Sequence, residues 1–159
     1  MSKKIIFING LIDLAQPRLG TKVIFKTDDF FASANRIINQ ADPVFKDGVF
    51  DKHGKWMDGW ESRRKRIKGH DYIILKLGKP GFIKKVDVDT SHFNGNQPSM
   101  VSIEGANSSS NKIGKLRWLK LLSKKKIKAN SHHFFMTNSK KVFTHIKFNI
   151  FPDGGVARL

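Results

Sequence analysis

The chain has 159 residues, of which 39% are hydrophobic, and a formal net charge of +17. This length and apolar content indicate one folded domain and exclude a disordered chain. The absence of cysteine excludes disulfides, a cysteine nucleophile and cysteine-ligated zinc.

The first fifteen residues resemble a signal peptide, because a basic start is followed by apolar residues. Asn9, Gly10 and Asp13 interrupt that apolar run, however, and no small-x-small cleavage site follows. No run reaches the ~18 apolar residues that span a bilayer. We therefore expect a cytoplasmic protein without membrane contact. We also expect a single domain over residues 1–159, with its core from about residue 10 onward.

The first half of the chain carries few regular signals. Residues 30–39 predict one short helix, which would begin from Asp28 or Asp29 as its N-cap. Segment 54–66, GKWMDGWESRRKR, contains glycines and lacks a hydrophobic period, so we interpret it as a loop.

Strand signals dominate the second half. Residues 71–77 and 82–89 are rich in β-formers, and Gly78-Lys79-Pro80-Gly81 predicts a turn between two strands that could form a hairpin. Short strands joined by polar loops indicate an all-β antiparallel sandwich or jelly roll with a loop platform at one end. Three further strands are predicted, at 100–104, 118–122 and 142–150.

Segment 54–66 is the first candidate site. Arg63 and Arg64 offer forked donors that clamp a carboxylate or phosphate. Asp58 or Glu61 could transfer protons in a site made apolar by Trp60. The alternative is that the tryptophans only fill one end of the sandwich and that the arginines are solvated.

The second candidate cluster follows the strand predicted at 82–89. Asp89, His92, Asn94 and Asn96 would gather at one loop end, where an acid and a histidine could form a proton-transfer pair. Capping of turns by Asp and Asn is the structural alternative. The spacing is not diagnostic of a metal site, so we assign no metal and no cofactor, although a divalent cation is compatible with these residues.

The third cluster is the histidine pair His132 and His133. Adjacent residues on a strand point to opposite faces, so one histidine should point inward and the other outward. Either one could instead be an ordinary core or surface residue.

Together and in this order, the clusters resemble the allantoicase family. The similarity covers nearly the whole chain, and GKWMDGWESRR with FPDGG is too long a combination to arise by chance. The matching segments are LIDLA (11–15), TDDFFA (27–32), GKWMDGWESRRKR (54–66), GHD (69–71), VDVDTSHFNGN (86–96), SHHFF (131–135) and THIKFNIFPDGGVARL (144–159). The resemblance implies a jelly-roll β-sandwich related to galactose-binding and discoidin-type domains.

The resemblance also implies hydrolysis of allantoate to ureidoglycolate and urea, a step of purine breakdown. Allantoate is a carboxylate on a carbon that bears two ureido groups. Arg63 or Arg64 would hold its carboxylate, and Asn94 or Asn96 would bind its ureido amides. The proton donor and the group that activates water would come from Asp58, Glu61, Asp89 and His92. Trp60, His132 and His133 complete the expected substrate-binding set.

The chain departs from the family pattern in its length. Allantoicases carry two tandem copies of this domain, whereas this sequence holds one, closest to the first, and its last strand is cut short at residues 157–159. We therefore expect a homo-oligomer if the site needs both copies, or an inactive domain. The terminal Ala157-Arg158-Leu159 mimics a peroxisomal signal, which we interpret as coincidence.

The net charge is the second departure. The lysines lie mostly outside the matching segments, at 112–128 and 140–141. Neutral accumulation of lysines on a solvated surface is therefore the simpler explanation of the charge. Nucleic acid is a disfavoured partner, because the aromatic residues lie beside acids rather than among the lysines. The main functional alternative is a non-catalytic module of the same fold that binds ureides or sugars.

Overall fold

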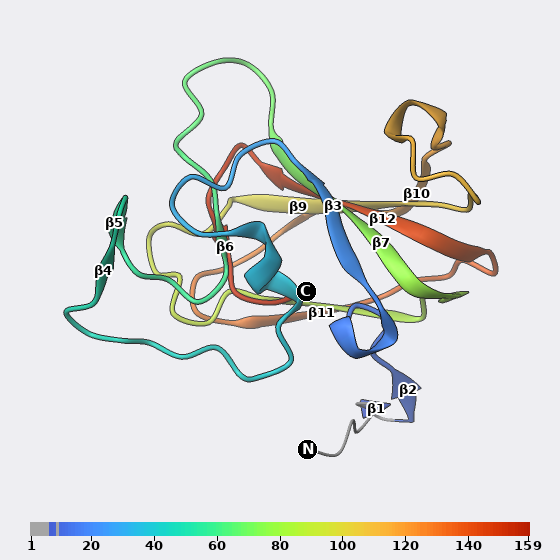
Figure 1. Cartoon of the computed structure of the whole chain (residues 1–159), viewed down its shortest axis with the longest axis horizontal. Coiled ribbons are helices and arrows are strands. Elements are labelled where there is room, and N and C mark those ends of the chain that lie inside the picture. The colour runs from blue at the N-terminus through green and yellow to red at the C-terminus, as the bar shows by residue number, and fades with distance from the viewer. Residues whose placement is uncertain (1–6, 9) are drawn as a thin grey trace.

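A computed structural model describes residues 7, 8 and 10–159 (Figure 1). Its centre is an antiparallel sheet of five strands in the order β10-β9-β12-β7-β3. These strands are β3 (Lys22–Lys26), β7 (Asp71–Phe82), β9 (Met100–Ala106), β10 (Leu119–Lys126) and β12 (Val142–Phe151). The two edge strands of this sheet are therefore β3, from the early part of the chain, and β10, from the lysine-rich segment.

Short strand pairs form the second layer and the periphery. In Figure 1, β11 crosses below the central sheet, and the β4–β5 hairpin projects from one side. The pairs are β8 (Lys85–Asp89) with β11 (His132–Met136), β6 (Trp60–Glu61) with β13 (Gly155–Val156), β4 (Phe50–Asp51) with β5 (Gly54–Lys55), and β1 (Phe7–Ile8) with β2 (Leu11–Ile12). The helical elements are 3-10 turns: η1 (Pro17–Leu19), η2 (Ala34–Ile38) and η3 (Ile113–Lys115). In the described part of the chain, no helix has the length and apolar character needed to cross a membrane.

The core lies between the two layers and follows from strand alternation. On β7, Ile73 and Leu75 are buried, and Phe148 on β12 lies in the same cluster. Val88 of β8 and Trp60 of β6 belong to that cluster from the second layer. The all-β sandwich predicted from alternation is therefore confirmed, and it sets β6, β8 and β13 against the central sheet.

The predicted turn at Gly78–Gly81 is wrong, because β7 continues through it to Phe82. The register against β12 shifts there, which makes this segment a bulge inside one strand. Gly78 is needed for a close approach instead: a Cβ on it would lie 2.0 Å from the backbone oxygen of Leu19. The predicted hairpin is also corrected, since β7 pairs with β12 and β3 whereas β8 pairs with β11.

The predicted helix over residues 30–39 shrinks to the 3-10 turn η2. Its N-cap is Ser33, whose hydroxyl accepts a hydrogen bond from the backbone of Asn35, rather than Asp28 or Asp29. Asp29 still contributes, because its carboxylate accepts a bond of 3.1 Å from the backbone N–H of Ala34. The predicted loop at 54–66 is largely confirmed, although it contains the two-residue strands β5 and β6.

Candidate functional site

The loop end of the sandwich contains a pocket of about 490 Å³. Three residues of the second sequence cluster line it: His92, Asn94 and Asn96. Lys55 and Met57 come from segment 54–66, although neither was among the predicted site residues, and Phe45 and Asn130 lie outside every predicted cluster. A mixed apolar and amide lining of this size suits a small polar ligand.

Glu61 lies next to this pocket on a rigid support. Its backbone pairs with Gly155 of β13 on one side and with Ala32 on the other. The backbone N–H of Glu61 donates to the Ala32 oxygen at 3.1 Å, and the N–H of Ala32 donates back at 3.2 Å. Because the backbone of Glu61 is hydrogen-bonded on both sides, the position of its Cα, from which the carboxyl group projects, is fixed.

The side chain of Glu61 contacts the pocket wall through Asn96. Nδ2 of Asn96 donates to Oε1 of Glu61 at 3.0 Å. Burial raises the pKa of Glu61, the Asn96 hydrogen bond opposes this rise, and the charge of Asp51 adds to it, so the net pKa lies above its ordinary value. A carboxyl group in this state keeps its proton to higher pH than a solvated one, as a general acid requires.

His92 and Asn130 form the far side of the pocket in an unusual backbone conformation. Both have positive φ, 69° and 45°, which is uncommon for residues other than glycine. The backbone N–H of His92 donates to Oδ1 of Asn130 at 2.9 Å. Nε2 of His92 lies 3.1 Å from the carbonyl oxygen of Pro43, so this nitrogen carries the hydrogen. Nδ1 is then left as an acceptor that could take a proton.

Lys55 is the cation of the pocket lining. Its ammonium lies 4.5 Å from the centre of the Phe45 ring, a cation–π distance. None of the lining residues is acidic, so the Lys55 charge is not neutralised within the lining. The sequence signal was present, since Lys55 belongs to the GKW run, but the two arginines that follow were the more obvious anion ligands.

Asp58 is turned away from the pocket lining and held by Arg158. Nη2 of Arg158 lies 2.8 Å from Oδ2 of Asp58, and the backbone of Val44 donates to the same oxygen at 3.0 Å. Burial alone would raise the pKa of Asp58, but the Arg158 and Val44 hydrogen bonds and the Arg158 charge lower it below its ordinary value. These contacts favour the ionised form of Asp58, the residue that the sequence offered as a proton donor.

Arg158 also fixes the chain segment that approaches the pocket. Its guanidinium donates to the carbonyl oxygens of Arg36, Ala41 and Asp58 as well as to the Asp58 carboxylate. The segment between residues 41 and 58 carries the lining residues Phe45, Lys55 and Met57. Nothing in the sequence marks Arg158 for this role, because its partners are distant along the chain.

Three residues predicted from segment 54–66 lie outside the pocket. Trp60 is 0% exposed, packs in the core and donates its indole N–H to the Asp28 oxygen, so it offers no surface to a ligand. Arg63 is paired with the Asp28 carboxylate at 2.6 Å. Arg64 is exposed and makes no ion pair with any residue that the structure describes.

Asp87 and Asp89 of β8 and His132 of β11 form a separate cluster on the outer face of that strand pair. Nδ1 of His132 lies 2.8 Å from Oδ2 of Asp87, and Nε2 lies 3.7 Å from Oδ2 of Asp89. The hydrogen bond to Asp87 is the main reason that the pKa of His132 is raised. Asp89 is buried and accepts the Ser91 N–H. Among the described residues, the histidine that faces its carboxylate is His132 and not His92.

His133 points the opposite way from His132, as the alternation on a strand predicts. Its Nδ1 lies 2.9 Å from the Val88 carbonyl oxygen, and its Nε2 accepts the Lys128 N–H at 2.8 Å. These two partners place the ring hydrogen on Nδ1 and leave Nε2 as the acceptor. Both ring nitrogens are used internally, which leaves His133 without a free group for substrate.

Comparison with known proteins decides the family. The model of the allantoicase repeat matches residues 12–159. This chain belongs to the allantoicase family. It is 51% identical over 149 residues to "Probable allantoicase" of Pseudomonas fluorescens (strain SBW25), covering 93% of this chain and 45% of that protein. The corresponding protein of Acinetobacter baumannii (strain SDF) is 46% identical over 152 residues, with coverages of 96% and 45%. The chain thus spans about half the length of the curated allantoicases it matches.

Solved structures agree with this membership. Crystalline allantoicase from Saccharomyces cerevisiae superposes with a TM-score of 0.80 at 32% identity, covering 92% of this chain and 46% of the yeast chain. A family 32 CBM from Clostridium perfringens, solved with galactose, superposes with a TM-score of 0.57 at 13% identity. The second likeness shows the fold alone, and it confirms the jelly-roll sandwich of the galactose-binding type.

Proposed function

We propose that this domain hydrolyses allantoate to ureidoglycolate and urea at the pocket beside Glu61. The observation that carries the proposal is the Glu61–Asn96 contact of 3.0 Å, which joins a carboxyl group of raised pKa to a ligand-accessible amide in a chain of the allantoicase family. In this reaction water replaces one ureido group on the central carbon, and the departing nitrogen gains a proton.

Each polar group of the pocket has a part in this proposal. Lys55 attracts the allantoate carboxylate, in place of the arginines expected from the sequence. Asn94 and Asn96 bind the ureido arms. One N–H of Asn96 donates to Glu61, which leaves its Oδ1 to accept a ureido N–H and its second N–H to donate to a ureido oxygen. Amide side chains suit ureido groups because both partners present donors and acceptors.

Proton transfer is assigned to Glu61 and His92. Glu61 holds its proton beyond the ordinary carboxyl range and delivers it to the departing urea nitrogen. His92, with its hydrogen on Nε2 directed to Pro43, has Nδ1 free to accept a proton from the attacking water. The proposal gives Asp58 and Asp89 no part in proton transfer, because Asp58 is paired with Arg158 and Asp89 faces His132.

A second domain of this type is part of the proposal. The curated allantoicases contain about twice the length that this chain matches. We propose that domains of this type associate with one another in the active protein. The assembly would be a homo-oligomer with one pocket in each copy.

The experiment is an allantoate assay on purified protein whose mass in solution has been measured. Urea and ureidoglycolate should form in equal amounts, and the Glu61→Gln variant should form both at least about 100-fold more slowly while remaining folded. Absence of product at micromolar protein, in a preparation of any assembly state, would overturn the hydrolase proposal. Heat of allantoate binding without product would instead support a ureide-binding module, which is favoured by the small number of free proton-transfer groups at the pocket.

A further inference from the structure

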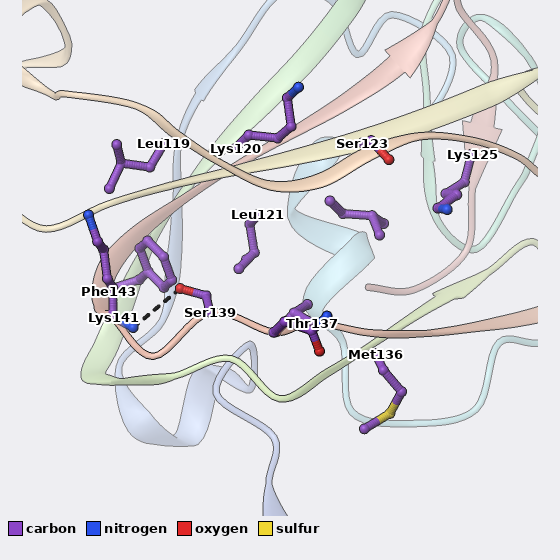
Figure 2. Close-up of a pocket in the computed structure, with 12 residues that line it drawn as sticks. Leu119, Lys120, Leu121, Ser123, Lys125, Met136, Thr137, Ser139, Lys141 and Phe143 are labelled. Carbon is purple, nitrogen blue, oxygen red and sulfur yellow. Dashed lines mark hydrogen bonds between the residues drawn. The ribbon is translucent and has the colours of Figure 1, made fainter.

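A second cleft of about 550 Å³ lies beside the edge strand β10 (Figure 2). One wall is the edge strand β10, and the other is the segment that leads from β11 into β12. None of its lining residues lines the pocket beside Glu61. It is therefore a separate feature of the same domain.

The cleft brings together the two lysine-rich segments that the family motifs do not include. Its lining residues come from within segments 119–125 and 136–143, which contribute Lys125 from one wall and Lys141 from the other. In Figure 2 these lysines lie at different ends of the cleft. The lining residues, all of them described, include no acid that would neutralise this charge. Two segments that are separate in sequence thus form one basic site. Neutral accumulation of lysines over the surface would not by itself predict this grouping.

Lys120 also borders the cleft but has a different setting. It stands opposite Glu104 in the β9–β10 ladder, and paired residues of a ladder share one face of the sheet. Its charge therefore lies near a carboxylate. Lys125 and Lys141 are both exposed and form no ion pair with any described residue.

The floor between the lysines is apolar. Figure 2 shows Leu121 and Phe143 between the two walls, and Phe143 is 1% exposed. Leu119 and Met136 remain 42% and 69% exposed at the rim, where they would gain by being covered. Ser123 and Asn138 add polar groups that hydrogen-bond to no other residue in the described part of the chain.

We propose that this cleft binds a small amphipathic anion, consisting of an acidic head on an aliphatic or aromatic body. The acidic head contacts Lys125 or Lys141 and accepts a hydrogen bond from Ser123 or Asn138. The apolar body covers the exposed side chains of Leu119 and Met136, above the buried Phe143. The volume falls in the range of small-ligand sites, roughly 300–1,000 Å³. An added peptide strand is disfavoured because two register shifts interrupt the β10 ladder, and bulged edges resist further pairing.

The test uses octanoate as a carboxylate probe and octyl phosphate as a phosphate probe, with octanamide as the neutral match. Binding to the full chain is followed by amide NMR shifts and by titration calorimetry. We expect both anions, but not octanamide, to shift the signals of residues 119–125 and 136–143. The tighter of the two anions identifies the head group. Shifts located elsewhere, or equal binding of octanamide, would overturn the proposal.

A matched pair of variants separates the cleft from the general positive field. Lys125→Gln with Lys141→Gln should weaken octanoate binding roughly 3- to 30-fold, as expected for two partly solvated ion pairs. Lys68→Gln with Lys79→Gln removes the same charge from exposed positions outside the cleft and should leave binding unchanged. Equal weakening by both pairs would contradict a specific site. Because the readout is binding, failure of allantoate turnover would not affect the result.

Discussion

Arg158 and Asp58 form an ion pair of 2.8 Å in which both side chains are almost buried, with 11% and 9% of their surface exposed. The pair joins the segment after β13 to the start of β6, and its arginine also holds the carbonyl oxygens of residues 36 and 41. A residue that sequence reasoning treated as incidental thus positions the segment that carries Lys55.

The first prediction concerns this pair. Arg158→Ala should lower the free energy of unfolding by about 3–5 kcal/mol, because it leaves the Asp58 carboxylate buried without its partner. Urea denaturation measures the loss. Arg63→Ala is the matched control, since Arg63 also pairs with an aspartate but its side chain is 60% exposed. An exposed pair contributes about 1 kcal/mol or less. Similar losses of unfolding free energy in the two variants would show that the buried Arg158 pair stabilises the fold no more than the exposed Arg63 pair does.

The second prediction concerns proton transfer by Glu61. Glu61→Gln should reduce kcat for allantoate by roughly 10²- to 10⁴-fold, because the amide cannot deliver a proton to the departing nitrogen. Stability should not fall at neutral pH, since glutamine resembles the protonated carboxyl group that burial favours. The measurement is steady-state kinetics with a parallel urea titration. A variant that is fully active would remove Glu61 from the mechanism.

The third prediction distinguishes the two possible anchors of the substrate carboxylate. Lys55→Gln should raise the Kd for allantoate roughly 5-fold, the effect of losing one solvated charge pair. Arg64→Gln removes an equal charge from a side chain outside the pocket lining and should leave the Kd unchanged. Calorimetric titration at one salt concentration compares them. A larger rise in Kd for Arg64→Gln than for Lys55→Gln would instead support the arginine anchor inferred from the sequence.

These outcomes depend on what local sequence can and cannot encode. Alternation of apolar residues was sufficient to predict β9 and β12, because each strand has one face in the core. It could not reveal that β7 continues past Pro80, since Gly78 is explained by the approach of Leu19, which is distant along the chain. Strand partners were equally hidden, because pairing of β8 with β11 depends on contacts 45 residues apart.

The candidate site follows the same division. His92, Asn94 and Asn96 lie in one short loop, so their proximity was predictable. Glu61 belongs with them only because Asn96 reaches it from another segment. Asp58 carries the same type of side chain as Asp89, and only the three-dimensional structure shows that Arg158 occupies the one and His132 faces the other. The type of side chain indicated that both aspartates could transfer protons, but it did not indicate which charged residue each one faces in the fold.

The fourth prediction concerns the dependence of stability on pH near neutrality. The pKa of His132 is raised in the folded protein, mainly by its hydrogen bond to Asp87, with Asp89 and Asp42 adding their charges. The folded state therefore binds the proton more tightly than the unfolded state does. This contribution to stability is complete below the unfolded pKa of about 6.5 and is lost as pH rises through the folded pKa.

His132→Gln should therefore remove a fall in stability that the unmodified chain shows above pH 6.5. The measurement is the difference in urea midpoint between the two proteins from pH 6 to pH 8.5. Burial lowers the pKa of His145, but this histidine is present in both proteins and cancels in the difference. A difference that stays constant across this range would contradict the assigned role of His132.

The last prediction concerns Gly155, which pairs with Glu61 across β6 and β13. A Cβ at this position would lie 2.0 Å from Cε1 of Phe93, a side chain that is 0% exposed and follows His92 directly. Gly155→Ala must displace Phe93 or the strand, at a cost of about 1–3 kcal/mol in stability. Because the same displacement moves the loop of His92 and Asn94, allantoate binding should weaken as well. Gly114→Ala is the control, since a Cβ there would meet nothing within 4 Å, and it should change neither stability nor binding. If Gly155→Ala is as stable as Gly114→Ala, the packing between Phe93 and β13 does not position the pocket.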